Sequence, residues 1–144
     1  PRRPDKEDGI RRSQRLLLTW LIETPALFEK IEGIITADDF VENLYHQVAQ
    51  MVFDGHREGN LNPAAILSRF INDEDQYKEV AALFNASLKE SLNNEEQKKA
   101  FSETVMKVRK NSLDVASRNA KDITQLQEII RQQAALKQLH ISLD

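Results

Sequence analysis

Glycine and proline are absent from this sequence after residue 63. The chain has 144 residues, and its four prolines and four glycines all lie at or before Pro63. β-Hairpins and barrels need such turn residues about every ten positions. The sequence therefore predicts an all-α fold. The absence of cysteine also excludes a disulfide framework and any cysteine-based metal or redox site.

The net charge of −3 is unevenly distributed along the chain. Residues 1–15 sum to +3, residues 16–96 to −10 and residues 97–144 to +4. An acidic body repels nucleic acid, which argues against direct nucleic-acid binding. The longest apolar stretch, residues 16–22 with Thr19 inside it, is far shorter than the roughly 20 residues that span a bilayer. We therefore expect a cytoplasmic protein with no membrane segment and no signal peptide.

Apolar periodicity and capping residues predict seven helices. Residues 1–9 are polar and rich in proline and arginine, which predicts a linker and a fragment of a longer protein. A compact bundle of five short helices is expected over residues 10–93, with helices at 10–23, 25–32, 38–58, from 63 and at 74–88. Thr24, Thr36 and Asn62 are the expected caps. Two long helices, opened near Asn94 and Asp122, then predict an antiparallel hairpin over residues 94–144.

Both expected hairpin helices carry apolar residues at heptad spacing. In the first, Phe101, Val105 and Val108 are four and three residues apart. The second, expected to continue to residue 143, has more apolar positions than the ~100° stripe that one neighbouring helix covers. Two interpretations stay open: the excess is a docking surface, or the hairpin folds back and buries it against the bundle.

The sequence offers little for catalysis. It contains no phosphate-binding loop, no dinucleotide fingerprint and no zinc-protease or serine-hydrolase motif. Glu42 and His46 could share a helical face, but one pair supplies at most two metal ligands. The acidic clusters at Asp38-Asp39 and 73–75 lie at expected helix starts, where caps explain them better than Mg²⁺. We therefore expect neither catalysis nor a cofactor or metal in this chain.

Spaced apolar and capping residues run through most of residues 10–143, among them Arg15-Leu16-Leu17-Leu18, Thr24-Pro25 with Leu27-Phe28, Asp38-Asp39-Phe40, Leu44-Tyr45-His46, Gly59-Asn60-Leu61-Asn62-Pro63 and Ile66-Leu67-Ser68-Arg69-Phe70. This pattern resembles the carboxyl-terminal helicase-binding domain of bacterial DNA primase, the DnaG type. The amino-terminal domain of the DnaB-type replicative helicase shares that fold and is the closest alternative. Arg12-Ser13-Gln14-Arg15 behind a basic Pro/Arg segment, and the end of the chain soon after the hairpin, favour the primase side.

The resemblance implies a non-catalytic interaction module that binds the hexameric replicative helicase, recruits primase for RNA primer synthesis and stimulates the helicase. In that family the hairpin makes the main helicase contact, which coincides with the apolar excess of the last helix. We expect a helix-in-groove or helix-bundle contact and a fragment that is monomeric by itself. Its expected anchors are Leu126, Ile129, Ile130 and Leu136, and its expected rim is Gln133, Lys137 and His140.

An alternative from a different functional class is a helical nucleic-acid-binding module that uses the basic amino-terminal arm and the lysines of residues 98–121. Such a module predicts binding that weakens steeply with salt. The acidic body of residues 16–96 argues against it.

Overall fold

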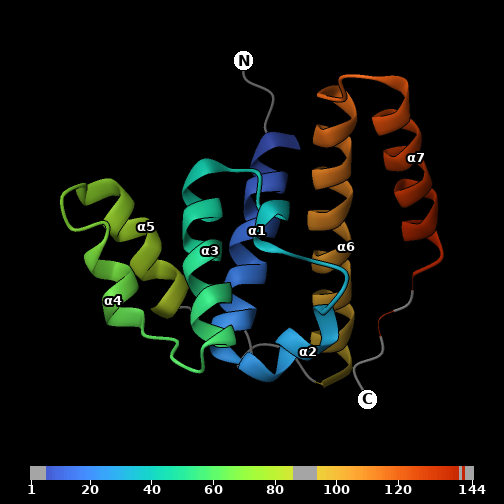
Figure 1. Ribbon diagram of the computed structural model, residues 1–144. Coiled ribbons are helices and arrows are strands. Elements are labelled where there is room, and N and C mark those ends of the chain that lie inside the picture. The colour runs from blue at the N-terminus through green and yellow to red at the C-terminus, as the bar shows by residue number, and fades with distance from the viewer. Residues whose placement is uncertain (1–5, 86–93, 140, 142–144) are drawn as a thin grey trace.

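All regular structure in the computed structural model is helical over the residues it describes, which are 6–85, 94–139 and 141 (Figure 1). The expected all-α class is confirmed. The elements are α1 (Lys6–Glu23), η1 (Pro25–Leu27), α2 (Phe28–Ile31), η2 (Ala37–Asp39), α3 (Asn43–Arg57), α4 (Pro63–Ser68), α5 (Glu74–Asn85), α6 (Asn94–Arg118) and α7 (Ile123–Lys137), where η marks a short 3₁₀ helix.

Helix α1 lies at the centre of the molecule, in contact with α3, α5 and α6 (Figure 1). The pair α4 and α5 lies at one end, and α7 packs on α6 at the other. The apolar pattern of α1 explains its place, since Leu17, Leu18 and Leu21 are fully buried in one core cluster. One core therefore extends from α5 to α6, and α7 stands outside it.

The first half of α6 is part of this core. Phe101, Val105 and Val108 are buried in the same cluster as the α1 leucines, and Trp20 meets Phe101 edge to face with ring centroids 5.7 Å apart. Helix α6 lies along α1 and does not project from it (Figure 1). Helices α6 and α7 are antiparallel neighbours, but the expected division into a bundle and a projecting hairpin is not confirmed.

The expected helix at 38–58 is wrong at its start. Thr36 and Asp39 form the expected capping box, with the Thr36 N–H donating to Asp39 Oδ2 at 2.8 Å, but they close only the 3₁₀ turn η2. Phe40 then runs extended and fully buried. Helix α3 begins afterwards, where the Glu42 carboxylate accepts hydrogen bonds from the second and third N–H groups of the helix.

Other boundaries differ by one to two turns. Helix α1 begins at Lys6, inside the segment 1–9 expected to be linker, and α7 ends at Lys137, before the expected residue 143. Thr24 makes no side-chain capping bond, whereas the Asn62 side chain accepts from the Ala65 N–H at 3.2 Å as expected. The end expected for α5 at residue 88, and the segment 86–93 before α6, lie outside the described residues.

Candidate docking surface on the last helix

Helix α7 has no fully buried residue, because among the described helices its main packing partner is α6 alone. Its inner face is half-buried and carries Leu126, Ile129, Gln133 and Leu136. Gln133 Nε2 donates to Oδ1 of Asp114 on α6 at 3.2 Å. These residues therefore hold α7 on α6.

The outer face of α7 is exposed and partly apolar. Ile123 is 72% exposed and Ile130 is 53% exposed. They are seven residues apart, so both lie on one side of the helix. Gln127, Ala134 and Lys137 continue this line at heptad spacing and are also exposed. We call these five residues the outer stripe.

The structure therefore divides the expected helicase-binding residues between two faces. Ile130 and Lys137 lie on the outer stripe and are accessible. Three of the four expected anchors, Leu126, Ile129 and Leu136, are half-buried on the inner face with Gln133. His140 lies outside the described residues.

Ile123 was not among the expected anchors, although it is the most exposed large apolar side chain on α7. Its heptad relation to Ile130 is readable from the sequence and could have identified it. The sequence does not show which of the two apolar lines on this helix faces α6.

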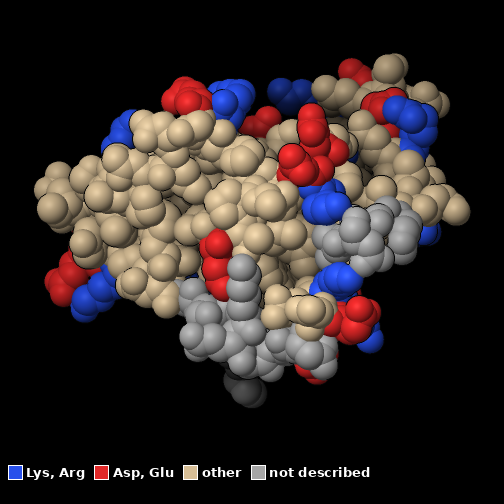
Figure 2. Space-filling model, turned by 90° about the horizontal axis from the view of Figure 1, so that it is seen from below, with Lys and Arg blue, Asp and Glu red and all other residues tan. Residues whose placement is uncertain are grey.

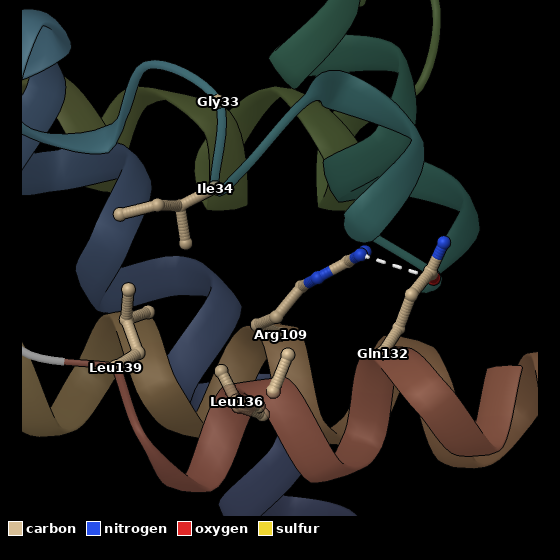
Figure 3. Close-up of a pocket in the computed structure, with 7 residues that line it drawn as sticks. Gly33, Ile34, Arg109, Gln132, Leu136 and Leu139 are labelled. Atoms are coloured by element: carbon tan, nitrogen blue, oxygen red, sulfur yellow. Dashed lines mark hydrogen bonds between the residues drawn. The ribbon is translucent and has the colours of Figure 1, made fainter. Parts of the chain in front are cut away.

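A groove of about 150 Å³ lies between α7, α6 and the turn after α2 (Figure 3). Ile34 of the turn faces Leu136 and Leu139 across it, and Arg109 projects from α6 into the same space (Figure 3). Arg109 Nη1 donates to Asp39 Oδ1 at 2.7 Å, and its Nη2 donates to Gln132 Oε1 at 3.3 Å. One guanidinium therefore links η2, α6 and α7 and fixes how α7 sits.

A charged cluster lies on α7 at the edge of the outer stripe. Arg131 forms an ion pair with Glu128, and Gln132 Nε2 donates to the same carboxylate at 2.9 Å. These hydrogen bonds, the Arg131 bond first, hold the pKa of the Glu128 carboxyl below its ordinary value. Glu128 therefore stays ionised, and its charge is offset by Arg131 at neutral pH.

No cluster of three or more metal-ligating side chains occurs within the described residues. The side chains of Glu42 and His46, which could have shared a helical face, have separate partners: Glu42 caps α3, and His46 Nδ1 lies 3.0 Å from the Ala37 carbonyl oxygen. Asp73 acts as a cap, because its Oδ1 accepts from the Gln76 N–H at 3.1 Å. Both carboxylates stabilise helix starts, which agrees with the expectation for Asp73, whereas Glu42 was expected inside a longer helix.

The face seen from below is largely uncharged over α3, α4 and α5, and charged side chains lie mostly near its margins (Figure 2). Its Lys and Arg side chains are scattered, and most lie beside acidic ones (Figure 2). On the described part of this face, no continuous basic track is visible that could follow a nucleic-acid backbone.

The sequence matches no protein-family model, and comparison with curated proteins and with solved structures finds no similar protein or fold. Among the described helices, none combines the length and apolar character needed to cross a membrane.

Proposed function

We propose that this chain is a non-catalytic protein-docking module of the bacterial primase type. In this proposal it binds the amino-terminal domains of a hexameric replicative helicase, and so recruits primase to the replication fork and stimulates the helicase. The exposed outer stripe of α7 is the observation that carries the proposal.

The shape of the outer stripe suits a helical partner. Ile123 and Ile130 are about 10 Å apart along the axis, two turns of an α-helix. Gln127 and Ala134 lie between and beyond them along the helix and add no charge to the surface. Lys137 ends the line. An apolar line of this spacing packs into the groove of a partner helix or helix pair, with polar groups at its rim.

The inner face supports docking indirectly. Leu126, Ile129 and Leu136 hold α7 on α6, and the Arg109 link to Gln132 anchors it further. A partner would therefore meet a helix that is already folded and positioned, and little ordering entropy would be lost on binding.

The test is titration of the replicative helicase amino-terminal domain with Ile130→Asp and Ile123→Asp variants of this chain. Both side chains are exposed, so the fold should survive, as circular dichroism will show. A buried central anchor contributes about 2 kcal/mol, so each variant should bind about thirtyfold more weakly. Binding that is unchanged in both variants contradicts the proposal.

Ile71 provides a matched control. It is 67% exposed between α4 and α5, at the other end of the molecule from α7 (Figure 1). Ile71→Asp makes the same chemical change to an equally accessible isoleucine and should leave helicase binding unaltered. Equal losses in Ile71→Asp and Ile130→Asp would show a general effect of added charge and remove the assignment to α7.

A further inference from the structure

Another cavity, of about 390 Å³, lies between α2 with the turn that follows it and the last turns of α3. Helix α2 lies near the carboxyl end of α3 (Figure 1). Cavities of roughly 300–1,000 Å³ are large enough to enclose a ligand. Gly33 is the one residue that this cavity shares with the groove at Arg109, and no residue of the outer stripe lines it. It is therefore a candidate site separate from the docking surface on α7.

Three aromatic rings line this cavity. The His56 ring stacks on the Phe28 ring with centroids 4.0 Å apart and ring planes 9° apart, and Phe53 meets Phe28 edge to face at 5.1 Å. Phe28 is buried beneath its two neighbours, whereas Phe53 is half-buried and His56 is exposed. A ligand can therefore reach the Phe53 and His56 rings from solvent. Such a flat apolar wall accepts an aliphatic stem or a planar group.

Two carboxylates without partners lie at the rim of the cavity. Glu29 and Glu32 line it and are exposed, and neither carboxylate forms an ion pair or hydrogen bond with a described residue. They are three residues apart around the single turn of α2, so they lie on one side of it. Arg57 also lines the cavity, but its Nη2 donates to Asp54 Oδ1 at 2.6 Å, which offsets its charge. The rim is therefore acidic, and the last turn of α3 adds the negative end of a helix dipole.

We propose that this cavity docks a peptide segment of a partner protein in which an arginine or lysine stands next to a bulky apolar residue. An arginine side chain suits both features of the cavity, because its guanidinium pairs with carboxylates and its stem and planar head pack on aromatic rings. The neighbouring apolar side chain covers the remaining aromatic wall. The charge of −10 over residues 16–96 attracts such a segment and repels an acidic peptide or a nucleic acid.

The test follows ¹H–¹⁵N NMR spectra of the whole chain during titration with an acetylated and amidated hexapeptide of alternating leucine and arginine, at constant ionic strength. The backbone amides of Gly33, Thr36 and His56, which line the cavity, should shift and saturate together. A hexapeptide of alternating serine and arginine should bind at least about tenfold more weakly, because it buries no leucine side chain. A hexapeptide of alternating leucine and glutamate should not bind.

A pair of double variants separates the rim from the overall charge of the chain. Glu29→Gln with Glu32→Gln keeps the shape of the rim, removes both charges and should weaken binding of the leucine–arginine hexapeptide about tenfold. The control Asp75→Asn with Glu103→Gln removes two exposed carboxylates from α5 and α6, outside the cavity, and should bind as the parent does. All four side chains are exposed, so both variants should fold, as circular dichroism will show.

Three outcomes overturn the proposal. Equal losses in the two double variants would show only a general attraction to the acidic body. Arginine amide that binds as tightly as the leucine–arginine hexapeptide would show a site for a single small cation and not for a peptide. Shifts that do not saturate would show no site at all. No helicase enters this experiment, so its failure is distinct from a failure of the docking surface on α7.

Discussion

The guanidinium of Arg109 donates to the carboxylate of Asp39 across 70 residues of sequence, with Nη1 2.7 Å from Oδ1. The Asp39 side chain is only 5% exposed, and its other oxygen accepts from the Thr36 N–H. The Arg109 Nη2 group reaches Gln132 on α7. This pair joins the core, the turn before α3 and the candidate docking helix.

Arg109→Met should therefore destabilise the protein. It leaves the Asp39 carboxylate buried without its cationic partner, which costs about 3 kcal/mol in free energy of unfolding. Urea denaturation measures the loss. The double variant Asp39→Asn with Arg109→Met should recover much of it, because no unpaired charge stays buried. A loss below about 1 kcal/mol in Arg109→Met, as for a surface ion pair, would contradict this role.

Tyr45 gives a prediction on pH. Its hydroxyl donates to Glu79 Oε2 at 2.7 Å, and Arg11 lies over its ring at 5.1 Å from the centroid. Burial first, and then the Glu79 carboxylate, raise the pKa of Tyr45 above its ordinary value of 10.0. The folded state therefore holds this proton more tightly than the unfolded state, so its stabilising effect is complete below pH 10 and is lost as the pH rises above 10.

Comparison with Tyr45→Phe isolates this titration. Near pH 7 the variant should be less stable by about 1.5 kcal/mol, since it lacks a hydrogen bond to a carboxylate. Above pH 10 the parent should lose up to about 1.4 kcal/mol per pH unit relative to the variant. Urea midpoints measured between neutral and strongly alkaline pH test this. A gap between the two proteins that stays constant with pH would disprove it.

Alanine substitutions on the two faces of α7 should change the free energy of unfolding by different amounts. Leu136 is half-buried against the groove at Arg109, so Leu136→Ala should lower the free energy of unfolding by about 1–2 kcal/mol. Ile130 is mostly exposed, and Ile130→Ala should stay within about 0.5 kcal/mol of the parent. Thermal unfolding of both variants checks the difference. A larger loss in Ile130→Ala would mean that the outer stripe packs on the protein itself.

Sedimentation separates the primase-type proposal from the helicase-type alternative. Stable interfaces bury at least about 1,000 Å² with good complementarity. Two exposed isoleucines on α7 offer far less apolar surface than such an interface needs. The isolated chain should therefore sediment as a monomer at micromolar concentration. A stable ring or higher oligomer would favour the helicase amino-terminal domain.

Local signals in the sequence predict much of the fold. The heptad line of Phe101, Val105 and Val108 is a buried line on α6, and Asn62 and Asp122 cap the helices they precede. These features depend on residues within one or two turns of each other, so the sequence alone contains them. The start of α3 could not be predicted in this way, because Asp39 is held by Arg109 from a distant helix.

The candidate docking surface, too, could be predicted from the sequence only in part. The run of residues without glycine or proline after Pro63, with its apolar repeats, determined that this chain ends in long helices and that α7 carries more apolar surface than one neighbour covers. Only the tertiary structure decided that Leu126, Ile129 and Leu136 face α6 while Ile123 and Ile130 face outward. A helix with two apolar lines can pack on either one. Contacts between distant residues, such as the Arg109 link to Gln132, select which line is buried.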